Sequence, residues 1–180
     1  MKDQKLSQTI MAGLRETAGI LVLAILLSLV LRAYIVEARV IPSGSMLPTI
    51  QLNDRVLVNK FIYRFQQPER LDVIVFEPPV ETGQKEDFIK RIIALPGDEV
   101  EVRGGQVFIN GEALTETYLF EKPLYRFGPV TVPANSYFVM GDNRNHSYDS
   151  HLWNAWLTFD HIKGKAFYTY WPVNRLGALQ

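Results

Sequence analysis

The pattern of apolar and polar residues changes character once along the chain, near residue 37. Residues 1–17 are mostly polar, whereas residues 18–36 are apolar except for Ser28 and Arg32. A helix that spans a bilayer needs about 20 apolar residues, so this run is long enough if the Arg32 side chain reaches the interface. The pattern predicts an N-terminal tail over residues 1–17, a membrane-spanning helix over residues 18–36 and a folded domain over residues 37–180.

A cleaved secretory signal peptide is the alternative interpretation of the same run. The 14 residues before Arg32 form an apolar core, with Ser28 as its one polar residue, of the length found in such peptides. Val36-Glu37-Ala38 loosely fits the small-x-small pattern of a cleavage site. The two interpretations differ in whether the mature protein keeps its anchor.

From Arg55 onward, short apolar or alternating runs separated by turn residues predict β-strands. The expected strands cover residues 55–58, 73–76, 88–95, 99–103, 106–109, 130–132, 137–140 and 165–171. Gly104-Gly105 and Asn110-Gly111 are signals for two-residue hairpins, and Thr158 is expected to cap one helical turn. Many short strands joined by turns predict a mainly β domain built from an antiparallel sheet or a barrel-like sheet.

Three polar features stand out against this β pattern, and the first is the serine-rich segment at residues 42–49. Its sequence is Pro-Ser-Gly-Ser-Met-Leu-Pro-Thr, and it lies between the apolar run and the first predicted strand. Each proline fixes one backbone dihedral, so the segment is expected to form a rigid, exposed turn that presents a hydroxyl. Clusters of serine, glycine and proline also occur in ordinary loops, so this feature alone does not identify a nucleophile.

The second feature is Lys90, which lies within an apolar predicted strand. Alternate residues of a strand face the same side, so Lys90 is expected to share a face with Phe88, Ile92 and Ala94. Burial lowers the pKa of a lysine by up to ~3–5 units, and a neutral amine can act as the general base for a serine. The alternative is a lysine whose side chain lies along the sheet and reaches water.

The third feature is a dense polar loop at residues 141–151, which follows the predicted strand 137–140 directly. It carries carboxylates, an arginine and hydroxyls in one short run, a set that can hold a lysine in place. A solvated surface loop is the simpler alternative.

Together these segments resemble the type I signal peptidases, which are membrane-anchored Ser/Lys proteases that remove signal peptides. The matching segments, in the family's order, are residues 42–49, 53–58, 72–76, 90–98, 141–144 and 147–150. The chain end at residues 171–175 is similar to the cyanobacterial and plastid branch. The resemblance implies a signal-peptidase-type β domain, a retained anchor, cleavage after small residues, and neither a cofactor nor a metal.

The resemblance also implies a role for each candidate residue. Ser45 would be the nucleophile and Lys90 the general base. Ser43 would join the Ser45 backbone N–H in the oxyanion hole, and Ser147 would orient the lysine. The residues expected to support the loop are Asp142, Arg144 and Arg91, and those expected in the substrate pocket are Ile41, Met46, Phe88 and Ile89.

The implied partners are the signal peptides of exported preproteins and the lipid bilayer. The 19 basic and 19 acidic residues balance, so no strong field points to nucleic acid. The chain has no cysteine, which excludes disulfides, thiolate catalysis and cysteine zinc sites. Because signal peptides are cut on the trans side of a membrane, residues from Arg39 onward would lie on the exoplasmic side, periplasmic or lumenal, of a plasma or thylakoid membrane.

Several other interpretations remain open on the sequence. His146 and Asp149 could complete a triad with Ser45, whereas His146, His151 and His161 lack the spacing of a metal site. The chain could be a non-catalytic, membrane-anchored binding module, or a Ser/Lys protease with another purpose such as a self-cleaving repressor. The aromatic residues that follow the polar loop could be core residues or a patch that enters the bilayer interface. They are Trp153, Trp156 and Phe159.

Overall fold

The computed structural model describes residues 2–179, without the side chains of residues 2–10, 12 and 31–34. The chain divides after Val36 into two compact units. The first unit is helix α1 (Lys2–Tyr34). In the described part of the chain, Gly13–Val30 is the one helical stretch long and apolar enough to cross a membrane, and none of it is buried.

The helix differs in its bounds from the expected span. It ends at Tyr34, and Val36 opens strand β1 (Val36–Val40), whose alternating sequence suits a half-buried strand. The expected interfacial position of the Arg32 side chain lies outside the described residues. Large apolar side chains along the middle of α1 are more than half exposed, among them Ile20 and Leu23. Such a surface suits contact with lipid better than contact with water.

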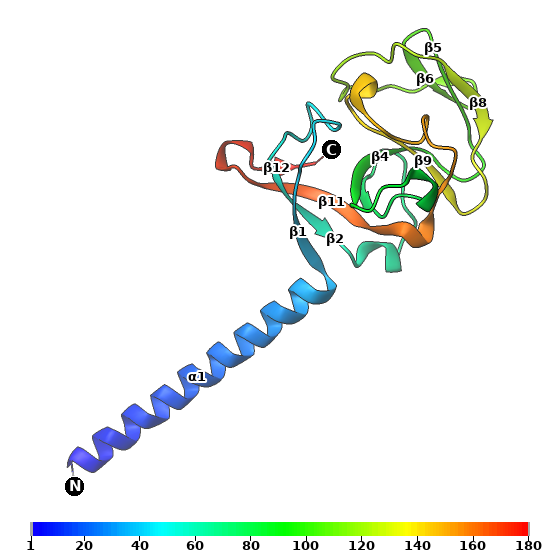
Figure 1. Cartoon of the computed structure of the whole chain (residues 1–180). Coiled ribbons are helices and arrows are strands. Elements are labelled where there is room, and N and C mark those ends of the chain that lie inside the picture. The colour runs from blue at the N-terminus through cyan, green and yellow to red at the C-terminus, as the bar shows by residue number, and fades with distance from the viewer. Residues whose placement is uncertain (1, 180) are drawn as a thin grey trace. The chain divides into compact units, whose positions relative to one another are not determined.

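The second unit contains two antiparallel sheets (Figure 1). In the larger sheet the described strands run in the order β1-β2-β11-β3-β4-β9-β10, and β12 pairs with β11. Their bounds, beyond β1, are β2 (Arg55–Asn59), β3 (Val73–Phe76), β4 (Phe88–Ala94), β9 (Ser136–Met140), β10 (Leu157–Thr158), β11 (Ile162–Trp171) and β12 (Gly177–Ala178). Strand β4 pairs with β3 on one side and with β9 on the other, so it lies inside the sheet.

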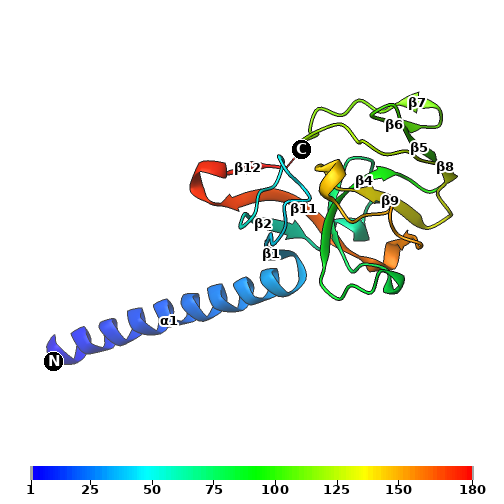
Figure 2. The ribbon, with the colours of Figure 1, turned by 45° about the horizontal axis from the view of Figure 1, so that its top comes forward.

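The smaller sheet lies beside β4 and β9 (Figures 1 and 2). Its described strands run in the order β7-β6-β5-β8. Their bounds are β5 (Glu99–Arg103), β6 (Gln106–Ile109), β7 (Glu112–Ala113) and β8 (Phe127–Thr131). Gly104 and Gly105 join β5 to β6 with φ of 58° and 78°, as a two-residue hairpin with positive φ at both positions requires. Both predicted hairpins are therefore confirmed.

Short 3-10 helices complete the unit. They are η1 (Ile62–Arg64), η2 (Val80–Thr82), η3 (Arg144–His146), η4 (Phe159–His161) and η5 (Val173–Arg175). Thr158 directly precedes η4, as predicted, but its hydroxyl lies 2.9 Å from His161 Nδ1 and caps no backbone N–H. The predicted position of the turn is therefore confirmed, but the Thr158 hydroxyl contacts the His161 side chain and not a backbone N–H.

The strand β4 separates apolar clusters on the two faces of the larger sheet. Ile92 packs with Phe76 and Trp153 on one face, and Ile89 belongs to a different cluster. Ala94 was expected on the face of Ile92 but packs in a third cluster with Ile93. The β4–β9 register shifts between Ile92 and Ala94, which turns the residues after the shift to the other face.

Candidate active site

Ser45 lies in the loop that joins β1 to β2, and neighbouring side chains hold this loop in place. Met46 and Ile50 on either side of the turn are fully buried in the core, and the Ile50 N–H donates to the Met46 carbonyl over 2.9 Å. The Asn143 backbone N–H donates to the Ser45 carbonyl over 3.0 Å, and the Asn143 side chain donates to the Gly44 carbonyl over 3.1 Å. The serine-rich segment is thus pinned to the polar loop predicted far along the chain.

The Lys90 side chain meets this loop from β4. Its Nζ lies 2.7 Å from Ser45 Oγ and donates to the Ile89 carbonyl over 3.1 Å. Lys90 is only 5% exposed, and its Nζ lies 5.1 Å from the centre of the Phe88 ring. The buried interpretation of Lys90 therefore holds, and the interpretation in which it reaches water does not.

This environment lowers the pKa of Lys90 to about 8. Loss of hydration on burial disfavours the ammonium and is the dominant cause. The nearby carboxylates of Asp149 and Asp142 act in the opposite direction but do not offset it. Lys90 can therefore lose its proton close to neutral pH while its nitrogen contacts a serine hydroxyl.

Two further serines lie near this pair. Ser43 Oγ is 3.4 Å from Ser45 Oγ. Ser147 Oγ is buried and has no hydrogen-bond partner among the described residues, so its expected bond to Lys90 is not formed in this structure. Gly141 allows the close approach, since a Cβ there would lie 2.4 Å from both Ser147 Oγ and the Ser45 carbonyl oxygen.

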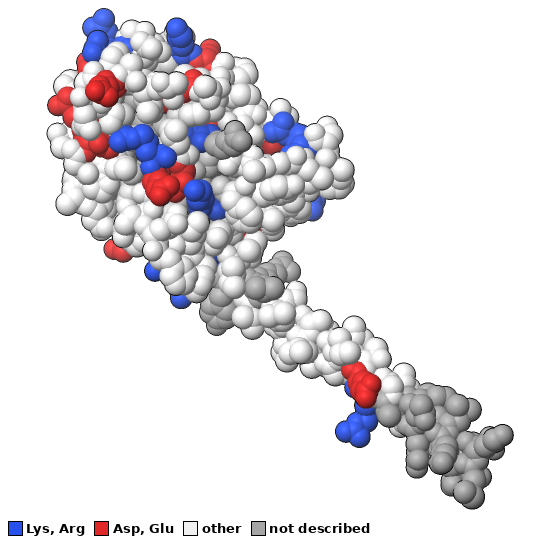
Figure 3. Space-filling model, turned by 180° about the vertical axis from the view of Figure 1, so that it is seen from behind, with Lys and Arg blue, Asp and Glu red and all other residues white. Residues whose placement is uncertain are grey.

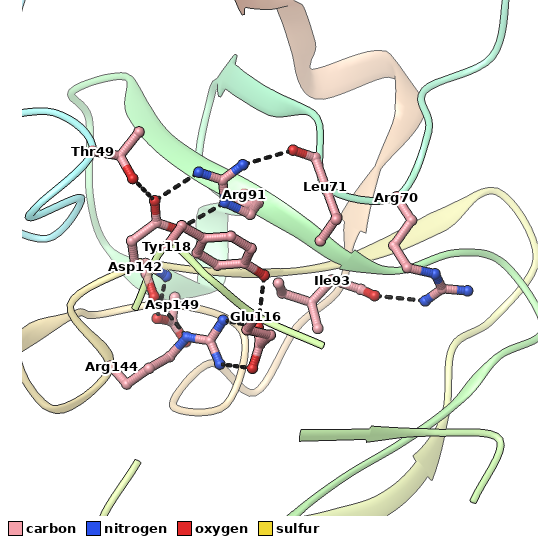
Figure 4. A network of polar contacts seen from close by, with 11 residues as sticks. Thr49, Arg70, Leu71, Arg91, Ile93, Glu116, Tyr118, Asp142, Arg144 and Asp149 are labelled. Atoms are coloured by element: carbon pink, nitrogen blue, oxygen red, sulfur yellow. Dashed lines mark hydrogen bonds and ion pairs between the residues drawn. The ribbon is translucent and has the colours of Figure 1, made fainter. Parts of the chain in front are cut away.

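A buried ion pair connects β4, which carries Lys90, with the polar loop after β9 (Figure 4). Arg91 donates through Nε and Nη2 to the two oxygens of Asp142 over 2.8 and 2.7 Å, and both side chains are fully buried. Arg91 Nη1 also donates to the Leu71 carbonyl over 2.9 Å, and the ring of Tyr118 covers the guanidinium. The Thr49 hydroxyl donates to Asp142 over 2.6 Å, which ties the serine loop to β4 and to the loop after β9.

Arg144 braces the polar loop from within. Its Nε donates to the Gly141 carbonyl over 2.9 Å, and its Nη1 donates to Glu116 over 3.1 Å (Figure 4). Arg144 is fully buried, so Glu116 supplies the countercharge that its burial requires. Glu116 had not been identified from the sequence, because it lies in a segment that reads as an irregular loop.

The contacts of Asp149 do not fit the alternative triad. Its carboxylate accepts the Gly141 N–H over 2.9 Å and lies 2.6 Å from His151 Nδ1. Among the described contacts Asp149 pairs with His151 and not with His146, and Ser45 Oγ contacts Lys90 Nζ and Ser43 Oγ. This geometry favours Lys90 over His146 as the candidate base. No group of three or more His, Asp or Glu side chains is arranged to hold a metal among the described residues.

A cleft of about 390 Å³ opens over Ser45 and Lys90. One wall is formed by residues 42–45 and the other by residues 86–90, and the rest of the lining is Asn143, His146 and Tyr148. Phe88 and Ile89 line the cleft as expected, whereas Ile41 and Met46 do not. The side chains of Ile41 and Met46 point into the core with Val56 and Val73, and are at most 2% exposed.

The aromatic residues after the polar loop belong to the core. Trp153 is 8% exposed and contacts the rings of Phe76, Phe88 and Tyr148. Trp156 and Phe159 are partly buried against the core clusters. The core interpretation is confirmed for Trp153, which supports the Phe88 wall of the cleft from beneath.

A serine hydroxyl beside a desolvated lysine, at the base of a cleft between two walls, defines a hydrolase of the Ser/Lys class. Comparison with known proteins narrows this class. The chain belongs to the signal peptidase family, peptidase S26, whose sequence profile matches residues 14–171.

The relatives include cyanobacterial and plastid enzymes. A signal peptidase I of Leptolyngbya laminosa is 48% identical, and the match covers 97% of this chain and 86% of the relative. The thylakoidal processing peptidase 1 of Arabidopsis thaliana is 40% identical over 85% of this chain and 47% of its own length. A solved signal peptidase I from Enterococcus faecalis is 31% identical, covers 56% of this chain and 97% of its own, and has a TM-score of 0.48.

Removing the charge of Asp142 is expected to destabilise the protein strongly. Asp142→Asn leaves the Arg91 guanidinium buried without its countercharge, so unfolding should become easier by about 3–5 kcal/mol. Denaturant unfolding of the detergent-solubilised chain measures the loss. Glu101→Gln is a matched control, because the Glu101–Arg103 pair is exposed and should contribute at most about 1 kcal/mol.

A double variant separates the effect of an unpaired buried charge from the loss of the ion pair itself. The double variant Arg91→Met/Asp142→Leu removes both buried charges and should be more stable than Asp142→Asn. If Asp142→Asn unfolds no more easily than Glu101→Gln, the pair does not hold the two segments together.

Proposed function

We propose that this serine endopeptidase cleaves signal peptides with Ser45 as nucleophile and Lys90 as general base. The observation that carries the proposal is the 2.7 Å contact between Lys90 Nζ and Ser45 Oγ in a site that excludes water from the amine. Neutral Lys90 accepts the hydroxyl proton as Ser45 Oγ attacks the scissile carbonyl carbon. The resulting ammonium then donates a proton to the leaving amine, and the acyl-enzyme is released by a water molecule that Lys90 activates in the same way.

The lowered pKa increases the fraction of molecules in which Lys90 is neutral and can act as the base. A shift from 10.5 to about 8 corresponds to roughly 3 kcal/mol of destabilisation of the ammonium. At pH 7 about a tenth of the molecules then carry neutral Lys90, a fraction roughly 300-fold larger than an ordinary lysine would have. The dyad therefore needs no histidine to work near neutral pH.

The neighbouring serines take the supporting roles. Ser43 and the Ser45 backbone N–H stabilise the oxyanion, and a donor of this kind contributes roughly 2.7–4 kcal/mol to the transition state. The 3.4 Å separation of the Ser43 and Ser45 hydroxyls supports this assignment. Ser147 orients Lys90 once substrate excludes the remaining water, and its buried hydroxyl, unpartnered among the described residues, is available for that bond. Asp142, Arg91 and Arg144 hold the loop that carries these groups.

The substrate binds as an extended strand in the cleft. Backbone groups along the two walls pair with it, as in other cases of strand addition, and Phe88 and Ile89 contact its side chains. Members of the family accept small residues at the first and third positions before the cut, and we assign the same preference to this cleft.

The first helix anchors the enzyme in the membrane with residues 1–17 in the cytoplasm. The exposed apolar surface of α1 and the short distance from Tyr34 to Ser45 along the chain support a retained anchor. The domain from residue 37 onward then lies on the exoplasmic side of a plasma or thylakoid membrane, where signal peptides are cut. The thylakoidal processing peptidase among its relatives fits this location.

Single introduced cysteines test this topology, because the chain contains none. In right-side-out vesicles, a membrane-impermeant maleimide should label Glu112→Cys and should label Lys5→Cys only after detergent is added. The reverse pattern contradicts the orientation. A mature protein that begins at Arg39 by intact mass contradicts the retained anchor.

The dyad is tested by conservative and non-conservative changes at the same positions. Ser45→Ala should abolish cleavage of a model preprotein without loss of fold. Lys90→Arg should be as inactive as Lys90→Ala across alkaline pH, because arginine keeps its proton in proteins. The measurement is single-turnover cleavage by purified full-length enzyme from pH 7 to 10.

Two results would contradict the assignment. Substantial activity in Lys90→Arg beside an inactive Lys90→Ala would make Lys90 an electrostatic support and not a base. Wild-type turnover by folded Ser45→Ala would remove the nucleophile and favour a binding module.

A further inference from the structure

A chain of alternating charges reaches the substrate cleft at Asp87. Arg39 of β1 lies 2.8 Å from Glu37 and 2.8 Å from Asp87, and Lys163 of β11 lies 2.5 Å from the other oxygen of Asp87. Lys60 extends the chain at one end, 3.7 Å from Glu37. Glu77 extends it at the other end, 3.9 Å from Lys163. The six side chains alternate in sign without a break.

The contact between Arg39 and Asp87 differs from the others in what it connects. Asp87 lines the cleft and immediately precedes β4, the strand that carries Lys90. Arg39 lies three residues before Pro42, where the opposite wall begins. In the order of the larger sheet, β1 and β4 are separated by β2, β11 and β3. The ion pair therefore joins two walls of the cleft that no backbone ladder of this sheet joins directly.

We propose that Arg39 and Asp87 form a latch that holds the two cleft walls at the separation an extended peptide requires. A strand inserted between two others needs them about 9–10 Å apart, twice the usual spacing of ~4.7–4.9 Å. An arginine and an aspartate that reach toward each other from opposite walls can bridge such a gap. The proposal rests on the proposed function, since it concerns binding of the same peptide substrate.

Burial and charge order give the latch its strength. The Asp87 side chain is 14% exposed and that of Arg39 is 34% exposed, so solvent screens the pair only in part. Glu37 and Lys163 carry charges opposite to those of Arg39 and Asp87, the residues they contact. Isolated surface ion pairs contribute little, whereas several charges in a network contribute more. On the face seen in Figure 3, basic and acidic side chains lie next to one another at several places on this unit.

The latch acts on substrate binding and not on the chemical step. Among the described contacts of Ser45 Oγ and Lys90 Nζ there is none to Arg39 or Asp87, so we expect the loss of either side chain to leave the dyad geometry in place. Without the ion pair the two walls are free to separate, so a peptide must bring them to the required separation when it binds. Arg39→Gln and Asp87→Asn should each raise KM about fivefold and change kcat less than twofold.

A double-mutant cycle with one matched control tests this. The assay uses full-length enzyme in detergent and a fluorogenic peptide with alanine at the first and third positions before the cut and no charged residue. Arg39→Gln/Asp87→Asn should raise KM no more than either single variant, because the pair is already broken in each. Lys163→Gln removes a cation from the same carboxylate without connecting the opposite wall, and its KM should stay within twofold of wild type.

Each outcome decides one point. Additive effects on KM in the double variant, or an equal effect in Lys163→Gln, would overturn the latch and leave only the local charge of Asp87. A fall in kcat with unchanged KM in Arg39→Gln would also overturn it. Unfolding temperatures of the variants, measured in the same detergent, separate these results from loss of fold. Failure of wild type to cleave the peptide, or cleavage by Ser45→Ala, would instead count against the proposed function.

Discussion

The arrangement of the whole site depends on the burial of one amine. Lys90 projects from an interior strand and meets Ser45 Oγ at 2.7 Å, where the lost hydration lowers its pKa to about 8. Burying a group that is charged in the unfolded chain costs stability. Because the unfolded chain binds more protons between pH 8 and 10.5, a cost of roughly 3 kcal/mol is fully present below pH 8 and fades as the pH rises toward 10.5. Buried Lys90 therefore weakens the fold at neutral pH, and the same burial makes its amine easier to deprotonate.

The surrounding polar groups restore the rigidity that such a site needs. Asp142 accepts from Arg91, the residue after Lys90, and from Thr49, four residues after Ser45. A single carboxylate thus fixes β4, the serine loop and the loop after β9 relative to one another. Arg144 and Glu116 brace the same loop from its other side. Both ion pairs are buried, so moving one partner away would leave the charge of the other buried and unpaired.

Local sequence was sufficient for most of the β-strands and for proposing Ser45 and Lys90 as a candidate pair, which the structure brings into contact. The predicted strands over residues 73–76, 99–103 and 106–109 have the observed bounds, because alternation and hairpin glycines are local signals. Strands β1, β7, β10 and β12 were missed. The last three have two residues each and carry no periodicity, and β1 begins at Val36, inside the expected membrane helix. Two features depend on contacts between residues distant in sequence, which no local pattern reports. They are the packing of the Ile41 and Met46 side chains into the core and the role of Glu116.

The protonation of Lys90 in the folded enzyme is the most direct test of this account. Heteronuclear NMR of the full-length chain in detergent, with lysine labelled at Cε, follows each amine through its titration, and Lys90→Arg identifies the signal of Lys90. The account predicts that this signal titrates near pH 8, well below the value of about 10.4 for a lysine in a model peptide. A Lys90 signal that titrates at the model-peptide value would contradict a desolvated neutral base, and with it the Ser/Lys mechanism drawn from the structure.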